Sequence, residues 1–342
     1  MYDELSNREK IILRYIIDDF IKTAIPVGSR YISKKTDINL SPATIRNVMS
    51  DLEDLNFLTH HHTSGGRVPT DKGYRYFVNE LMNDKPLKEN DRELLKNQIG
   101  DVDLAADEIY KEVSKILGRL SKEISIVSQP YLSEGLFEKI ELVSLSSTKL
   151  LVVVSVQSGL VRTILFDVES EFPRNKLGKF AAILNQKLSG LTLKEIRRTF
   201  RERIGDLQSD SKEIIKVFID SIDKIFQDEK EGLTLYIGGT TDILSQPEFD
   251  DTSNYKNIIE FTDDKDVVVH VLNSLPSESS GIAVSIGSEN KDEKLKNFSI
   301  VSTTYSIGDV KGKIALIGPK RMNYSKMISM LNYTSKLITE KI

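Results

Sequence analysis

Four polar side chains suited to contacting nucleic acid lie close together near the start of the chain: Ser41, Thr44, Arg46 and Asn47. In a DNA major groove, the hydrogen-bonding groups of arginine match guanine and those of asparagine match adenine. A serine or threonine at a helix start lies beside free N–H groups, which bind phosphate readily. These residue types predict a surface that reads DNA, and a solvated surface helix is the competing interpretation.

The element that must position these side chains is a short helix over residues 42–55. Ser41 has a side chain favoured at an N-cap, and Pro42 lacks only an N–H group that the first turn would leave without a partner. The residues repeating at helical spacing on the opposite face are all apolar: Ile45, Val48, Met49, Leu52 and Leu55. The pattern predicts a helix with one buried face and one polar face.

Two further helices are expected before it. Ser6 and Glu9 have the spacing of a capping box, which predicts a helix over residues 5–22. Ser29 and Arg30 begin a second short helix, and we expect both residues to contact phosphate at its start. A tight turn at 37–40 joins this helix, which we expect over residues 30–36, to the helix over 42–55 with its groove-compatible residues. Two short helices in this arrangement predict a helix-turn-helix.

A hairpin follows the 42–55 helix directly. Residues 57–60 have the pattern of a strand, and Thr63-Ser64-Gly65-Gly66 has the composition of a turn. The two glycines would let the backbone approach DNA, and the guanidinium of Arg67 would reach a phosphate or the minor groove. His60, His61 and His62 would point alternately to opposite faces of a strand, which favours phosphate contacts over a metal site. A hairpin in this place predicts the wing of a winged-helix domain.

The composition restricts where nucleic acid could bind. The 342 residues exceed one compact core, so two or three domains are expected. The net charge is −4, whereas residues 29–50 contain four cationic residues and one acidic residue. A DNA-binding surface must therefore be local. The chain contains no cysteine, which excludes disulfides, thiolate catalysis and cysteine-ligated zinc.

The sequence contains no signal that predicts membrane insertion or catalysis. No apolar run approaches the roughly twenty residues that span a bilayer, and the acidic N-terminus is no signal peptide, so the cytoplasm is expected. The single histidine outside the hairpin, His270, is predicted to pack within a helix. The stretch 238–242 lacks the spacing of a phosphate-binding loop and is predicted to be a tight turn. We therefore predict no enzyme, no cofactor and no metal site.

The remainder of the chain alternates between helical and strand patterns. We expect helices over 71–83, from the low 90s to about Ser125 with a division near 100–103, and over 175–188, 193–204, 211–227, 264–274 and 324–342. Residues 84–92 have the polar composition of a linker. Strands are expected over 139–145, 150–157 and 161–168, which form an antiparallel meander, and over 232–237, 281–287, 298–305 and 313–317.

Five stretches together carry a family resemblance. They are Pro26–Arg30, Ser41–Asn47, Thr63–Arg75, Gly238–Leu244 and Ile317–Ser325. The chain resembles the HrcA family of heat-inducible transcription repressors, from about residue 3 to the C-terminus.

The resemblance implies an α+β multidomain fold. Its parts would be an N-terminal winged helix-turn-helix, a GAF-like α+β domain and an α+β dimerisation domain inserted into the latter. On this chain we place the winged helix at 1–83 and a linker with the start of a connecting helix at 84–104. The GAF-like domain would comprise 105–129 and 231–342, and the insert 130–230.

The resemblance also implies a function and partners. The protein would be a homodimeric repressor that binds an inverted-repeat operator in double-stranded DNA upstream of chaperone operons. Heat would release it, and the chaperonin GroEL would modulate its activity. A metabolite-sensing winged-helix regulator that uses its GAF-like domain is one alternative. A scaffold whose winged helix binds protein is another.

Overall fold

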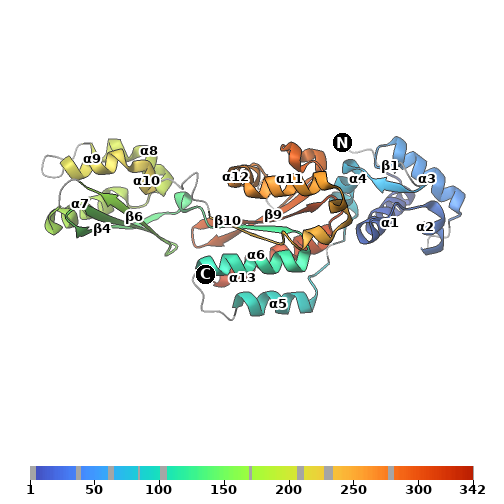
Figure 1. Ribbon diagram of the computed structural model, residues 1–342, viewed down its shortest axis with the longest axis horizontal. Coiled ribbons are helices and arrows are strands. Elements are labelled where there is room, and N and C mark those ends of the chain that lie inside the picture. Colours follow the sequence, from blue (N-terminus) through green and yellow to red (C-terminus); the bar gives the residue numbers. More distant parts are fainter. Residues whose placement is uncertain are drawn as a thin grey trace.

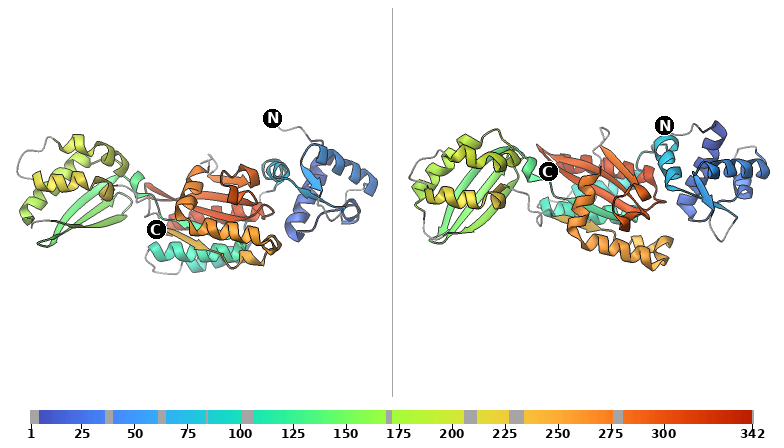
Figure 2. Two further views of the ribbon diagram at one scale, coloured as in Figure 1. Left: turned by 45° about the horizontal axis from the view of Figure 1, so that its top comes forward. Right: turned by 90° about the horizontal axis from the view of Figure 1, so that it is seen from above.

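The computed structural model describes residues 5–35, 40–60, 65–83, 85–100, 106–168, 172–205, 212–226, 234–275 and 281–341. Over these ranges the chain forms three lobes that lie in a row (Figure 1). The N-terminal lobe lies at one end, the central lobe contains the C-terminal helix, and a third lobe built from the middle of the chain lies at the other end; two further views show the same order (Figure 2). The predicted α+β multidomain class is confirmed.

The N-terminal lobe is a winged helix, as predicted. Its elements are α1 (Asn7–Thr23), α2 (Ser29–Lys35), α3 (Pro42–Asp54), β1 (Leu58–His60), β2 (Arg67–Pro69), α4 (Asp71–Tyr76) and the π-helical turn η1 (Phe77–Leu81). The capping box at α1 is confirmed, because the Ser6 hydroxyl accepts from the N–H of Glu9 and the Glu9 carboxylate accepts from the N–H of Ser6. The predicted turn at 37–40 and the tip of the hairpin, with His61 and His62, fall mostly on residues 36–39 and 61–64, outside the described residues.

The chain enters the central lobe with two helices, α5 (Glu89–Gly100) and α6 (Ala106–Ser121). The prediction that helix continues to about Ser125 is wrong. Lys122 takes a left-handed φ of 61°, which ends the helix, and Ile124–Ser128 form strand β3. Every residue of β3 is buried, so its sequence shows no alternation and resembles a buried helix.

The central lobe is a five-stranded antiparallel sheet between two helical layers. The strands are β3, β7 (Leu235–Gly238), β8 (Ile282–Ile286), β9 (Phe298–Ile307) and β10 (Val310–Pro319), in the spatial order β7-β3-β10-β9-β8. One face packs on α11 (Thr252–Asp263) and α12 (Lys265–Ser274), the other on α6 and α13 (Tyr324–Lys341) (Figure 1). This arrangement is consistent with the GAF-like domain expected here. The helix α11 was not predicted.

Short 3-10 turns complete the central lobe and connect it to the third. They are η2 (Leu132–Glu134), η3 (Ile243–Ser245), η4 (Pro247–Asp250), η5 (Gly287–Glu289) and η6 (Glu293–Leu295). The turn η2 leads into the third lobe, and η4 and η5 lie at the end of the central lobe that meets the winged helix.

The third lobe is a three-stranded meander with helices on one face. Its elements are β4 (Phe137–Ser146), β5 (Lys149–Val156), β6 (Val161–Asp167), α7 (Arg174–Leu188), α8 (Leu193–Ile204), α9 (Lys212–Asp220) and α10 (Ile222–Phe226). The predicted meander is confirmed by antiparallel pairing of β4 with β5 and of β5 with β6. Where one helix was expected over 211–227, the chain breaks at Ser221 into α9 and α10.

Candidate nucleic-acid interface

The start of α3 has the cap predicted from its sequence. Ser41 has extended backbone, its hydroxyl accepts from the N–H of Thr44 at 3.1 Å, and Pro42 is the first helical residue. The hydroxyls of Ser41 and Thr44 lie 2.9 Å apart and share a hydrogen bond. At the other end, Asn56 takes a left-handed φ of 62°, so the chain leaves α3 sharply for the hairpin. Both ends of the helix are thus fixed locally.

The two faces of α3 differ as the spacing predicted. Ile45, Val48, Met49 and Leu52 are buried against the rest of the lobe. Arg46 and Asn47 are exposed, Thr44 is half-buried beside them, and Ser41 is exposed at the cap. Within the described part of the chain, neither Arg46 nor Asn47 forms a side-chain hydrogen bond or ion pair. Their planar groups are free to pair with a ligand.

Of the two residues predicted to contact phosphate at the start of α2, one is exposed. Arg30 is exposed in the first turn, whereas Ser29 is only 8% exposed. Little of Ser29 is therefore accessible to a ligand. Arg30 is the better placed of the two residues for a phosphate contact.

The wing holds its arginine against the recognition helix rather than toward solvent. Nε and Nη2 of Arg67 donate to Oε2 of Glu53 on α3 at 2.9 and 2.8 Å, and the Arg67 side chain is 13% exposed. His60 on β1 contacts the other carboxylate oxygen of Glu53. The backbone of Arg67 also pairs with Val27, through two hydrogen bonds of 2.9 Å. The expected reach of the Arg67 guanidinium to DNA is thus not the arrangement found here, and Glu53, which sequence reasoning missed, links wing and helix.

The two other candidate sites in the sequence are the stretch after β7 and His270. The stretch after β7 is the predicted tight turn, and at Gly238 a Cβ would collide with the carbonyl oxygen of Ser114 on α6. His270 lies on α12 as predicted but is exposed rather than packed, so that part of the prediction is wrong. Over the described ranges, no three histidine, aspartate or glutamate side chains gather in a way that could hold a metal ion. No helix in those ranges combines the length and the apolar character needed to cross a bilayer.

Several known proteins are similar over the whole length. The heat-inducible transcription repressor HrcA of Chlorobium phaeobacteroides strain BS1 is 39% identical, covering 100% of this chain and 99% of the relative. That of Chlorobium chlorochromatii is 38% identical over 97% of this chain and 96% of the relative. A crystal structure described as a hypothetical protein at 2.2 Å resolution aligns with a TM-score of 0.61 and 21% identity, over 99% of this chain and 98% of that one. At that identity the likeness shows the fold alone.

A capped recognition helix with an exposed polar face, followed by a wing, defines a winged-helix transcription regulator. The family model described as "Winged helix-turn-helix transcription repressor, HrcA DNA-binding" matches residues 4–83, and "HrcA protein C terminal domain" matches residues 107–328. The chain belongs to the HrcA family of heat-inducible transcription repressors. Such repressors are not a class of enzyme.

Proposed function

We propose that the protein represses heat-shock chaperone genes by binding an inverted-repeat operator as a homodimer. Each copy would place α3 in the major groove of one half-site. The observation that carries this proposal is the free, exposed pair Arg46 and Asn47 on the first two turns of a rigidly capped helix. Side chains without a partner inside the protein can pair with a base edge without first breaking an intramolecular hydrogen bond.

The residues of this interface have separate roles in the proposal. Arg46 and Asn47 read base edges, and Thr44 positions or reads beside them. Ser41 and Arg30, with a smaller contribution from Ser29, contact phosphates. Arg67 supports the wing through Glu53 and reaches phosphate only if that pair opens.

Titration of operator variants with Arg46→Ala tests this assignment. The substitution is expected to cost about 1–3 kcal/mol and to relax the preference at one base position in each half-site. Arg174→Ala serves as the matched control, because Arg174 is an exposed arginine on α7 in the third lobe. Unchanged operator affinity and preference in Arg46→Ala would remove this residue from the reading set.

The surface that we propose for dimerisation is the uncovered face of the third-lobe sheet. Val143, Leu145, Val161 and Leu165 are exposed on it by 44, 57, 55 and 43%. The strand register brings Val143, Leu151 and Leu165 into one row across all three strands. An exposed apolar patch of this kind marks an interaction site, and a twofold operator requires a twofold protein.

Sedimentation velocity tests the dimer surface. Leu165→Glu is expected to convert a dimer into a monomer at micromolar concentration, because a carboxylate would be buried in an apolar contact. Gln186→Glu on α7 adds the same charge to an exposed position of the same lobe and should leave the dimer intact. A dimer that persists in Leu165→Glu would place the contact elsewhere.

Release by heat and support by the chaperonin GroEL complete the proposal, and both rest on the family resemblance. Operator titrations before and after a heat pulse, with and without GroEL and ATP, test them together. Operator affinity should fall after the heat pulse and should recover only in the samples that contain GroEL and ATP. Equal recovery without GroEL would count against the chaperonin, and unimpaired binding throughout would count against thermal release.

A further inference from the structure

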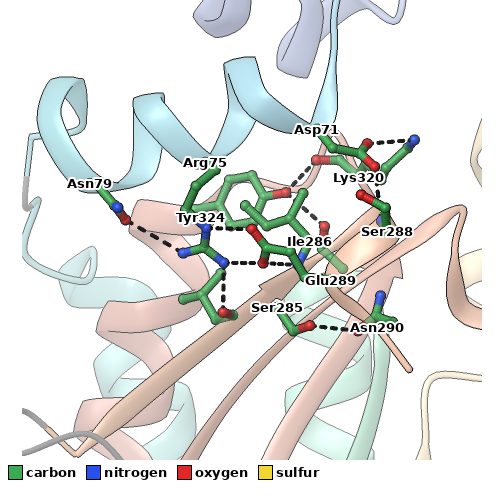
Figure 3. Close-up of polar contacts among 12 residues, drawn as sticks. Asp71, Arg75, Asn79, Ser285, Ile286, Ser288, Glu289, Asn290, Lys320 and Tyr324 are labelled. Atoms are coloured by element: carbon green, nitrogen blue, oxygen red, sulfur yellow. Dashed lines mark hydrogen bonds and ion pairs between the residues drawn. The ribbon is translucent and has the colours of Figure 1, made fainter. Parts of the chain in front are cut away.

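Residues of two motifs that are far apart in the sequence meet between the winged helix and the central lobe. Asp71 and Arg75 lie on α4, and Lys320 and Arg321 directly follow β10, some 249 positions further along the chain. Together with two residues of η5 they form a polar contact surface, and Figure 3 shows its members other than Arg321. We call this surface the interlobe joint, and its members are Asp71, Arg75, Ser288, Glu289, Lys320 and Arg321.

Asp71 is held by two partners from the central lobe. Its Oδ1 accepts from Nζ of Lys320 at 2.7 Å, and its Oδ2 accepts from the backbone N–H of Ser288 at 2.8 Å. The neighbouring Gly287 has a φ of 53°, and a Cβ there would collide with the Asp71 carboxylate. Partial burial raises the pKa of Asp71, but the hydrogen bonds from Lys320 and Ser288 outweigh it and hold that pKa below its ordinary value. The carboxylate is thus charged and closely fitted.

Arg75 makes the second attachment, one turn further along α4. Its Nε donates to Oε1 of Glu289 at 2.7 Å, and its Nη2 donates to the other carboxylate oxygen and, at 2.8 Å, to the carbonyl oxygen of Val284 (Figure 3). The side chain is 18% exposed. A bidentate arginine–carboxylate pair fixes orientation as well as distance. Asp71 and Arg75 together therefore define how α4 lies on the central lobe.

Arg321 makes the third attachment, to α1. Its Nη1 donates to the carbonyl oxygen of Ile21 in the last turns of that helix at 3.1 Å. Its Nη2 donates to Glu248 at 3.0 Å, and the side chain is 13% exposed. Since α1 and α4 are separate elements of one lobe, fixing both removes rotation as well as translation.

The segment between the lobes is also attached. The hydroxyl of Ser325 donates to the carbonyl oxygen of Asn83 at 3.0 Å and accepts from the N–H of Lys85 at 3.2 Å. One turn later on α13, Ser329 donates to the carbonyl oxygen of Lys85 at 2.5 Å. The connection runs along α13 instead of acting as a free tether.

The joint leaves the reading face uncovered. Its contacts come from α1 and α4, and α4 lies on the side of the winged helix that faces the central lobe, whereas α3 lies on the far side (Figure 1). Arg46 and Asn47 remain exposed. The joint thus does not block DNA. It determines where α3 stands relative to the rest of the molecule.

We propose that Asp71, Arg75 and Arg321 are positioning residues for operator binding, which hold the α3 helices of a dimer at the separation of the two half-sites. The inference rests on the proposed function. When the winged helix is fixed, binding of one half-site presents the second α3 at a high effective concentration, and this gain is worth factors of about 10²–10⁴ in linked binding. When the joint opens, that gain is lost although each winged helix still folds and reads.

The joint is also the part of the assembly that we expect to open first on heating. Interfaces between lobes of one chain are more polar than cores, and relative motion is the default where they are not large and hydrophobic. Partial openings have lower free energies than unfolding of a core. Loss of operator binding on warming would then follow opening of the joint, below the temperature at which the winged helix melts.

Binding of a full operator and of a single half-site tests the proposal. Arg75→Glu opposes Glu289 and is expected to weaken full-operator binding at least about tenfold, with half-site binding within about twofold of wild type. The double variant Arg75→Glu with Glu289→Arg restores attraction and should recover part of the loss. Arg174→Glu makes the same charge change in the third lobe and is the control. Equal losses on both DNAs, unchanged full-operator binding, or tighter binding would each overturn the proposal.

A second measurement needs no DNA and stands apart from the proposed function. The chain has no cysteine, so cysteines placed at the exposed Arg8 on α1 and Lys265 on α12 allow two labels to report the distance between lobes. Wild type should give one narrow distance distribution that broadens on warming, and Glu289→Gln, which keeps the side-chain size, should broaden it at a lower temperature. An unchanged distribution in Glu289→Gln would refute the joint. Failure of wild type to bind any operator would refute the proposed function and leave this result in place.

Discussion

The wing offers a sharp test of whether Arg67 contacts DNA or positions the hairpin. Its guanidinium makes two hydrogen bonds to Glu53, at 2.9 and 2.8 Å, and is 13% exposed. Hydrogen bonds between charged partners contribute about 1.5–3 kcal/mol each in buried settings, and partial exposure of Glu53 reduces that. We therefore expect a coupling energy of about 1–2 kcal/mol between Arg67 and Glu53, measured on winged-helix stability.

The assay is a double-mutant cycle with Arg67→Ala, Glu53→Ala and the combined variant. If Arg67 positions the wing, each single variant weakens operator binding by a similar factor, and the double variant is little worse than either. The dependence of affinity on salt then keeps its slope in all three.

A phosphate contact by Arg67 would give a different pattern. Arg67→Ala alone would reduce the slope of log affinity against log salt concentration by about one per half-site, because binding would release one fewer cation from the DNA. Glu53→Ala would free the guanidinium and tighten binding. These two results together would refute the positioning role of Arg67 and would support the contact with DNA that the sequence predicts for it.

Three further substitutions have defined outcomes. Ser41→Ala removes the α3 cap and should lower winged-helix stability by about 0.5–2 kcal/mol in thermal denaturation; an unchanged melting temperature would contradict the cap. Burial raises the pKa of Glu123 well above its ordinary value, so the folded state binds the proton more tightly and the stability that this one group contributes is greatest at low pH. That stability should fall as pH rises above 4.5, by about 1.4 kcal/mol per unit while the group stays protonated. Glu123→Gln should flatten this part of the pH profile, and an identical slope in the variant would exclude Glu123 as its source. Gly287→Ala adds a Cβ that would collide with the Asp71 carboxylate, at a residue with a positive φ. It should weaken full-operator binding as Arg75→Glu does. Operator affinity equal to that of wild type would show that Asp71 can move away from the added methyl group.

The winged helix was predictable because its signals are local. The cap at Ser41, the proline after it and the left-handed Asn56 all act within a few residues of the helix they delimit. The apolar face of α3 follows from its spacing, so the exposed face follows too. The same spacing predicts that Arg46 and Asn47 are exposed, which is confirmed, and we propose that they read DNA because of their residue types and their place in the helix.

Errors arose where burial removed the pattern. All five residues of β3 are buried, and the chain passes from helix to strand at Lys122 without a glycine or proline to mark the change. A helical run before such a strand gives no sign of where it ends. His270 shows the opposite error, because a single polar residue in an apolar run predicts a packed side chain, whereas its helix places it at the surface.

The partners of charged residues lay beyond the reach of sequence. Arg67 pairs with Glu53 across 14 positions, and Asp71 pairs with Lys320 across 249. Nothing in the composition of a motif distinguishes an arginine that reads DNA from one that binds another lobe. Arg46 and Arg75 are both arginines in motifs that carry the family resemblance, and only the fold shows that Arg46 is exposed whereas Arg75 pairs with Glu289 of the central lobe.

That separation gives the two kinds of motif different consequences for repression. In the proposed interface, Arg46 contacts each half-site independently, so a change at Arg46 should shift base preference and leave the tolerated spacing between half-sites unchanged. Arg75 makes no contact with DNA in the proposed interface, so a change there should leave base preference unchanged. The affinity for operators with one or two base pairs inserted between the half-sites should then come closer to the affinity for the operator with natural spacing. A panel of operators that varies both sequence and spacing resolves the two. If Arg75→Glu changed base preference, or Arg46→Ala changed spacing tolerance, reading and positioning would not be separable, and the joint could not act as the part that heat opens while the reading helix stays folded.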